Sequence, residues 1–305
     1  MLYIIKFPFP MKLFKFIIPT CSLVFLLPSN FKTDAQQTTQ KKPGESVVAY
    51  QIEGMKDVIV KKDISYLKTA DSALKMDVYY PPKFDFKSNI PAIVIVCGYT
   101  NNGQVKAVGK QLRKWSAYTS WCQVIAASGM AAIVYETVNP EKDLTSLIQY
   151  ITSNADKINI DVNKIGAFAC SANTPTALAY ILNNPNCAFK CAAVYYGIFL
   201  NTDFKYLSTI DTLSQNMGFV TPRLSDPTSW NKNVPLMIVH VGKDFVPHSD
   251  ESLTGFLDKA ISQKVPFTLI HYATGIHGFD VYADNAEIRE IIKHTLGFWK
   301  YYLKQ

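Results

Sequence analysis

Residues 165–173 have the sequence Ile-Gly-Ala-Phe-Ala-Cys-Ser-Ala-Asn, in which an apolar, strand-like run passes through one serine into a helical pattern. This junction is typical of a nucleophile elbow, a tight turn that holds a serine in strained backbone angles with its Oγ above a sheet. The usual signature is G-x-S-x-G, and Ala169 and Asn173 stand at its glycine positions. Alanine is small and asparagine tolerates left-handed backbone, so the elbow stays a hypothesis. The alternative is that Ser171 only caps a helix.

Short runs rich in Val, Ile and Tyr alternate with longer segments of helical spacing on both sides of this stretch. That alternation predicts an α/β fold, with a mostly parallel eight-stranded sheet and helices on both faces. The predicted strands span 57–67, 74–80, 90–97, 130–138, 164–170, 192–196, 236–241 and 267–272, and the main predicted helices span 113–128, 141–155, 177–182, 249–262 and 285–303. Residues 199–233 mix aromatic and polar side chains, which predicts a small insertion or cap before the seventh strand.

Two further candidate residues follow predicted strands. Asp244 comes just after an apolar run, and His277 lies between Gly275 and Gly278 beyond the last strand. Loops at the carboxyl ends of parallel strands are where such sheets build their sites. Each residue also has a structural alternative, because Asp244 could cap the next helix and His277 could be a solvated turn residue. Their order along the chain, after Ser171, favours a shared site.

From about Lys75 to the C-terminus, the chain resembles the α/β-hydrolase superfamily, particularly its exported acetyl-esterase and dienelactone-hydrolase-like members. The segments that carry this resemblance are residues 76–81 (MDVYYP), 165–173, 242–247 (GKDFVP) and 277–279 (HGF). The chain departs from the family at the two elbow glycines. It also carries Cys-Gly-Tyr-Thr at residues 97–100, where esterases often have His-Gly-Gly-Gly.

The resemblance implies an α/β-hydrolase fold and a role for each candidate residue. Ser171 would attack the substrate, His277 would take and return its proton, and Asp244 would hold the imidazole in the right tautomer. The backbone N–H groups of Tyr99 and Ala172 would form the oxyanion hole. The expected reaction is hydrolysis of a carboxylic ester, on a small molecule or a glycan, without a metal or organic cofactor.

Three alternatives remain open at this point. The chain could be a serine peptidase of the prolyl-oligopeptidase type, which shares the order of the three residues but carries a long N-terminal region that is missing here. It could also be a catalytically silent hydrolase fold used for binding, given the altered elbow. Finally, a shift of one residue would make Cys170 the nucleophile, as in true dienelactone hydrolases.

The N-terminal residues predict export. Lys12 and Lys15 precede an apolar run, and a polar stretch then ends at Ala35, which is the pattern of a signal peptide over residues 1–35. The apolar run is too short to span a membrane. Residues 36–46 are expected to be a flexible lead-in, and residues 47–305 the hydrolase domain. Lipid attachment at Cys21 is less favoured than simple export, and Met11 is a candidate alternative start.

The composition fits a single exported domain. Of 305 residues, 270 remain after the predicted signal peptide, and the loss of four lysines and one aspartate lowers the formal net charge from +7 to +4. This mild charge, without a long basic run, argues against a nucleic-acid partner. The five remaining cysteines lack the His-rich surroundings of a zinc site. Pairing of Cys187 with Cys191 and the oligomeric state stay open.

Overall fold

The computed structural model describes residues 46–69, 72–201 and 203–304. Eight strands form one sheet in the order β1-β2-β4-β3-β5-β6-β7-β8. They are β1 (Ile59–Lys68), β2 (Ala73–Tyr80), β3 (Ile90–Ile95), β4 (Ala131–Tyr135), β5 (Ile160–Cys170), β6 (Phe189–Tyr195), β7 (Leu236–Lys243) and β8 (Phe267–Ile276). The pairs β1–β2 and β2–β4 are antiparallel and the other five are parallel. The predicted mostly parallel eight-stranded sheet is therefore confirmed.

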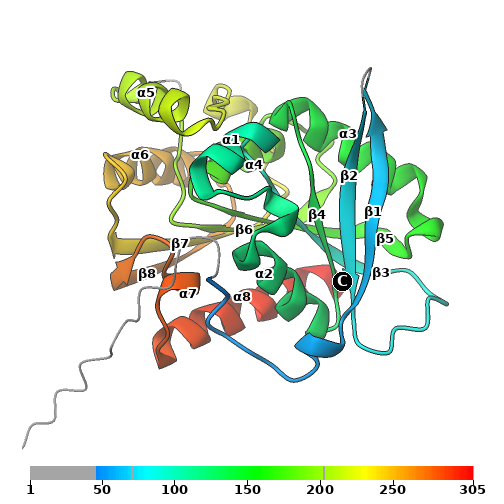
Figure 1. Cartoon of the computed structure of the whole chain (residues 1–305). Coiled ribbons are helices and arrows are strands. Elements are labelled where there is room, and N and C mark those ends of the chain that lie inside the picture. The colour runs from blue at the N-terminus through cyan, green and yellow to red at the C-terminus, as the bar shows by residue number, and fades with distance from the viewer. Residues whose placement is uncertain (1–45, 70–71, 202, 305) are drawn as a thin grey trace, which may run out of the picture. The chain divides into compact units, whose positions relative to one another are not determined.

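Helices cover both faces of this sheet (Figure 1). They are α1 (Asn101–Val108), α2 (Ser116–Ala127), α3 (Pro140–Ser153), α4 (Thr174–Leu182), α5 (Leu207–Met217), α6 (Ser249–Ser262), α7 (Phe279–Tyr282) and α8 (Ala286–Lys304). Helices α2 and α8 share one face, where the ring centroids of Trp121 and Trp299 lie 6.2 Å apart. Right-handed crossovers from β4 to β5 and from β5 to β6 put α3 and α4 on the other face.

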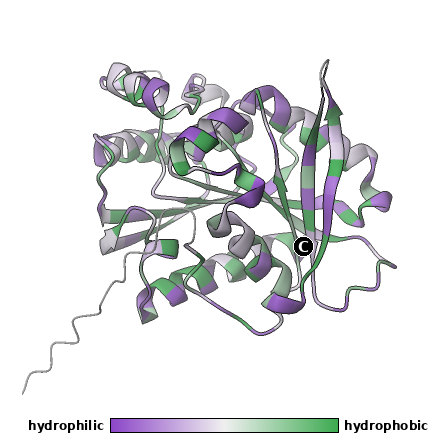
Figure 2. Cartoon of the chain, in the orientation of Figure 1, coloured by the Kyte–Doolittle hydropathy of each residue, from purple (hydrophilic) through white to green (hydrophobic). Residues whose placement is uncertain are grey.

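The core lies between the central strands and these helices. Every residue of β4 is buried, as a strand with neighbours on both faces requires. In α8 the buried residues recur at three- and four-residue intervals, including Ile288, Ile291 and Ile292. Figure 2 shows the result as alternating hydrophobic and hydrophilic colours along that helix.

The predicted insertion before β7 is present, and its described residues include the helix α5 and a short 3₁₀ turn at Pro227–Ser229. It is not a detached cap, because Phe199, Leu200, Leu224 and Trp230 are each at most 3% exposed and belong to the main core. The middle of the segment reaches the loop after β3, where Phe219 forms an antiparallel bridge with Tyr99.

The predicted signal peptide and most of the predicted lead-in lie outside the described residues. Ser46, the last residue of that lead-in, is fully buried. Over the described ranges, no helix is both long and apolar enough to cross a membrane. The five cysteines after residue 35 are free thiols, including Cys187 and Cys191.

Candidate active site

Ser171 stands at the apex of a strand-to-helix turn. The strand β5 ends at Cys170, whose backbone is extended, and Ser171 follows in left-handed backbone with φ of 54°. A non-glycine residue held in this region costs about 1–3 kcal/mol, which surrounding structure must offset. A 3₁₀ turn over Ser171–Asn173 then leads into α4, where Pro175 occupies the first turn at little cost because the N–H it lacks has no helical partner there.

Cys170 does not share this position. Its side chain is 7% exposed and points into the protein, where its Sγ lies 3.2 Å from the hydroxyl of Tyr118. Burial raises the pKa of the Cys170 thiol to about 12, so the thiolate that attacks as a nucleophile is strongly disfavoured. The geometry thus favours Ser171 over the frame that would place Cys170 at the apex.

Three predicted residues meet in a hydrogen-bonded chain. The Nε2 atom of His277 lies 2.7 Å from the Oγ of Ser171, and its Nδ1 lies 2.9 Å from an Oδ atom of Asp244. Asp244 follows β7 directly and His277 follows β8, so both come from the carboxyl edge of the sheet. Because a carboxylate oxygen can only accept, the imidazole donates from Nδ1, which leaves Nε2 free to accept from the serine hydroxyl.

Asp244 and His277 are well shielded from water. The side chains of Asp244 and His277 are 3% and 10% exposed. The N–H of Val246 donates to the same Asp244 oxygen that accepts from the imidazole, at 2.9 Å. This second donor fixes the carboxylate in the orientation that meets His277. An Asx turn over residues 244–246 thus explains why the aspartate stands directly after the strand.

Aromatic rings pack against the imidazole. The ring centroids of Tyr196 and Phe245 lie 4.6 Å and 4.7 Å from that of His277. Tyr196 is buried, whereas Phe245 is 76% exposed and flanks the histidine on the solvent side. The two rings restrict the rotation of the imidazole.

A buried carboxyl group lies behind this pair of rings. Asp280 is 2% exposed and accepts hydrogen bonds from the Tyr196 hydroxyl at 2.6 Å and the Trp121 indole N–H at 2.7 Å. Burial raises the pKa of the Asp280 carboxyl, and the two donors only partly oppose that effect. The sequence analysis did not single out Asp280, although it comes three residues after His277.

The loop after β3 lies against the elbow. Gly98 approaches it so closely that a Cβ there would stand 2.4 Å from the carbonyl oxygen of Ala172 and 2.9 Å from the Cα of Asn173. The N–H of Gly98 donates to the Asn173 side-chain oxygen at 2.7 Å. The structure therefore brings Tyr99, the neighbour of Gly98, beside the turn that contains Ala172 and Ser171.

Glu136 follows β4 and belongs to an ionic cluster. The Arg113 guanidinium donates to Glu136 at 2.7 Å and also binds Asp77 and Asp63. The side chains of Arg113 and Asp77 are 6% and 7% exposed. Glu136 therefore has a structural ion-pair role.

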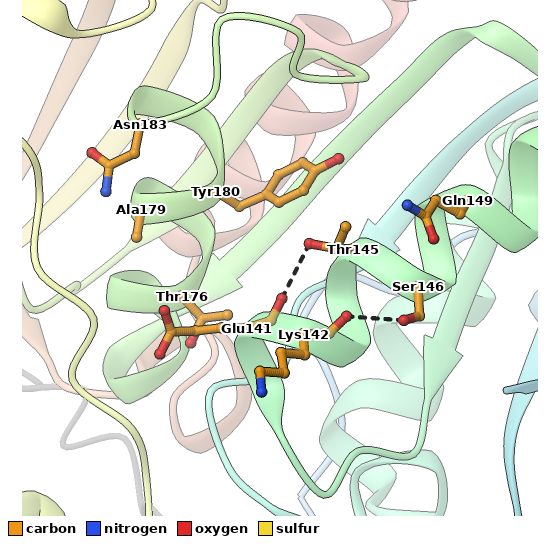
Figure 3. Close-up of a pocket in the computed structure, with 9 residues that line it drawn as sticks. All are labelled: Glu141, Lys142, Thr145, Ser146, Gln149, Thr176, Ala179, Tyr180 and Asn183. Carbon is orange, nitrogen blue, oxygen red and sulfur yellow. Dashed lines mark hydrogen bonds between the residues drawn. The ribbon is translucent and has the colours of Figure 1, made fainter. Parts of the chain in front are cut away.

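A pocket of about 530 Å³ opens between α3 and α4 (Figure 3), and Ser171, Asp244 and His277 are not among its lining residues. Two of its hydroxyl groups bind their own helix, since Thr145 and Ser146 donate to the carbonyl oxygens of Glu141 and Lys142. Among the residues that the structure describes, no group of three or more His, Cys, Asp or Glu side chains is placed to hold a metal ion.

Known proteins resemble this chain in structure rather than in sequence. No protein-family model and no curated protein sequence matches it. Among solved structures, the α/β hydrolase MGS-M1 from a Medee basin deep-sea metagenome library is similar with a TM-score of 0.56 and 14% identity. That alignment covers 82% of this chain and 99% of that one.

Two bacterial esterases are similar to the same extent. Thermogutta terrifontis esterase 2, in its form phosphoramylated by tabun, has a TM-score of 0.56 and 17% identity over 82% of this chain and 94% of its own. An inhibited esterase B from Lactobacillus rhamnosis has a TM-score of 0.59 and 15% identity over 84% and 90%. With so few residues in common, the shared feature is the arrangement of helices and strands.

Proposed function

The chain has the α/β-hydrolase fold, and we propose that it is a serine hydrolase that cleaves carboxylic esters through an acyl-enzyme intermediate. The observation that carries this proposal is the chain of hydrogen bonds from Asp244 through His277 to Ser171, with Ser171 at φ of 54° on the elbow. Ester hydrolysis, rather than another acyl transfer, is favoured by the esterases among the similar structures.

In the first half of the proposed reaction, His277 Nε2 takes the hydroxyl proton as Ser171 Oγ bonds to the ester carbonyl carbon. The carbonyl π electrons move to oxygen, and the resulting oxyanion accepts from the N–H groups of Tyr99 and Ala172. The carbon–oxygen bond to the alcohol then breaks, and the alcohol leaves with the proton that His277 returns. Asp244 stabilises the imidazolium that exists between these two steps.

In the second half, water replaces the alcohol. His277 takes a proton from the water as its oxygen bonds to the acyl carbon, and the same two N–H groups bind the second oxyanion. The bond to Ser171 Oγ breaks, and the serine recovers its proton from His277. The carboxylic acid leaves, and the enzyme returns to its starting state.

The proposed substrates carry a small acyl group, such as an acetyl group, either on a small molecule or on a glycan. Residues 199–233 support this choice, since this short segment is anchored in the core by Phe199, Leu200, Leu224 and Trp230 and meets the loop of Tyr99 through the Tyr99–Phe219 ring pair, whose centroids lie 5.6 Å apart. A long acyl chain would have little protein surface to cover it. Turnover of p-nitrophenyl esters of increasing acyl length, and acetate release from acetylated glycans, measure this preference.

A fluorophosphonate probe tests the proposed chemistry directly. Wild-type protein is expected to be labelled at Ser171 and to hydrolyse p-nitrophenyl acetate, and Ser171→Ala is expected to lose both. The matched control is Ser262→Ala, since that exposed serine only donates to the carbonyl of Lys259 in its own helix. Folded wild-type protein that is neither labelled nor active would refute the proposal.

Two other functions give different outcomes in the same assay. A prolyl-oligopeptidase-type peptidase would be labelled and would cleave prolyl amides in preference to short esters. A silent hydrolase fold used for binding would be neither labelled nor active. The chain of hydrogen bonds from Asp244 through His277 to Ser171 favours an esterase over a silent binding protein.

Export of the enzyme is part of the proposal. It is supported by the order of basic, apolar and small residues that ends at Ala35. Expression of the full chain in a bacterium with a periplasm, followed by fractionation and N-terminal sequencing, is expected to yield a product that starts at Gln36. A cytoplasmic product that keeps residues 12–35 would contradict it.

A further inference from the structure

Asn173 occupies the second glycine position of the elbow, and its side chain is fully engaged. The residue is 2% exposed. Its Oδ1 accepts from the backbone N–H of Gly98 at 2.7 Å, and its Nδ2 donates to the hydroxyl of Tyr118 at 2.5 Å. An amide that both accepts and donates under such burial is held in one orientation.

The backbone at Asn173 does not require glycine. Its φ of −83° and ψ of −18° lie in the right-handed helical region, which any residue adopts. What the turn requires is space, and Gly98 supplies it, because a Cβ at that position would come within 2.9 Å of the Asn173 Cα. The glycine that this turn needs is therefore Gly98, on the facing loop. Position 173 can then carry a functional side chain.

The bonds of Asn173 span both sides of Ser171. The Tyr118 hydroxyl accepts a hydrogen bond from the Asn173 amide. The same hydroxyl lies 3.2 Å from the Sγ of Cys170, the residue just before the serine. Gly98 immediately precedes Tyr99, whose N–H is one of the two proposed oxyanion donors. Asn173 therefore connects the loop that carries this donor to the residues that hold the nucleophile.

We infer that Asn173 is a positioning residue that holds the Gly98–Tyr99 segment in register with Ser171, so that the Tyr99 N–H points at the developing oxyanion. This inference rests on the proposed esterase function and adds a residue to its machinery. In this elbow the Gly98 N–H of the loop donates a hydrogen bond to the Asn173 side chain. In an elbow with glycine on both sides of the serine, backbone packing alone would hold the loop.

One consequence runs against the family signature. Asn173→Gly restores the second glycine of G-x-S-x-G, yet it is expected to lower kcat on p-nitrophenyl acetate by roughly 10- to 1000-fold, with little change in KM. The upper bound is the effect of losing one oxyanion donor outright. Asn173→Ala is expected to behave alike, and Tyr118→Phe to lose less, because it removes only the bond that orients the amide.

The experiment compares these variants with a matched asparagine elsewhere on the same helix. Asn183 ends α4, donates to the carbonyl of Arg223 and accepts from the N–H of Ser225, so it also ties a loop to that helix. Asn183→Gly is expected to keep the wild-type kcat. Thermal unfolding and circular dichroism identify folded variants, and the affinity for phenylboronic acid reports the oxyanion site apart from turnover.

The outcomes separate this inference from the proposed function. A folded Asn173→Gly variant that loses kcat and boronate affinity together, at constant KM, supports the inference. The inference is overturned if Asn173→Gly keeps the wild-type kcat, or if only its KM rises. The proposed function then still stands, provided that Ser171→Ala is inactive. If the wild type neither turns over esters nor binds the probe, the proposed function fails and the inference fails with it.

Discussion

Gly98 lies against the peptide of Ala172 at a distance that no other residue type fits, since a Cβ would come within 2.4 Å of the carbonyl oxygen. Gly98→Ala is therefore expected to shift the loop after β3. We expect a loss of about 1–3 kcal/mol in the free energy of unfolding and a lower kcat on p-nitrophenyl acetate.

The control for this change is Gly297→Ala. A Cβ at Gly297, in the middle of α8, meets no atom within 4 Å. Alanine there is expected to stabilise the protein by about 0.5–1 kcal/mol, because glycine is a poor helix former. Urea unfolding measures both variants, and a Gly98→Ala protein as stable and active as the wild type would contradict the packing described here.

Asp244→Asn is expected to lower kcat by about 10⁴-fold with a small effect on KM. The amide can turn its N–H₂ group toward His277 Nδ1, which puts the ring proton on Nε2 and leaves no acceptor for the Ser171 hydroxyl. Steady-state kinetics on p-nitrophenyl acetate checks this. Asp156→Asn, at an exposed residue that accepts from Asn89, is the control. Activity of Asp244→Asn within tenfold of wild type would argue against the proposed role.

Arg113→Met is expected to cost about 3–5 kcal/mol of stability, because it leaves the buried carboxylate of Asp77 and the mostly buried one of Glu136 without their cation. Lys87→Met breaks an ion pair whose side chains are 83% and 57% exposed and is expected to cost less than about 1 kcal/mol. Guanidinium unfolding at low and high salt distinguishes the two. Equal small losses would mean that the Arg113 cluster is solvated in solution.

The stability of the protein is expected to depend on pH through Asp280. Burial raises the pKa of its carboxyl above the value of 3.8 in the unfolded chain, so between the two values the folded state binds more protons. The free energy of unfolding of wild type minus that of Asp280→Asn therefore falls as the pH rises from about 3 to 7, by about 1.4 kcal/mol per unit of pKa difference.

The contribution of Asp226 to stability is expected to change with pH in the opposite direction. Hydrogen bonds from Thr228 lower the pKa of this exposed carboxyl, so the unfolded state binds more protons. The difference between wild type and Asp226→Asn then grows as the pH rises. Unfolding curves at several pH values test both variants, and a constant difference for Asp280→Asn would contradict a raised pKa at that carboxyl.

Apolar periodicity was enough to predict the strands and the helices α2, α3, α4, α6 and α8, whereas α1, α5 and α7 were not predicted as helices. All eight strands were predicted within a few residues, and 249–262 matches α6 at both ends. The helix α1 was missed because its eight residues lack a clear apolar face, although Thr100 caps it by accepting from Gly103 and Gly109 ends it at φ of 76°. Thr100 and Gly109 were therefore the sequence signals that could have identified this helix.

Contacts between distant residues account for what the sequence could not predict at the site. Trp121 and Asp280 are 159 residues apart, and Gly98 and Asn173 are 75 apart. Neither pairing follows from local spacing, since it depends on how the loops meet at the edge of the sheet. The order of Ser171, Asp244 and His277 was predictable because each stands at the end of its own strand.

The contact between residues 98 and 173 moves the need for glycine from the flank of the serine to the facing loop. A Cβ at position 98 would meet the backbone of Ala172 and Asn173, so a smaller side chain at 173 would not make room for it. Chains of this kind that carry a side chain such as asparagine at 173 are therefore expected to keep glycine at 98. A sequence search that demands glycine on both sides of the serine would pass over such chains, whereas a search that asks for glycine at position 98 would find them.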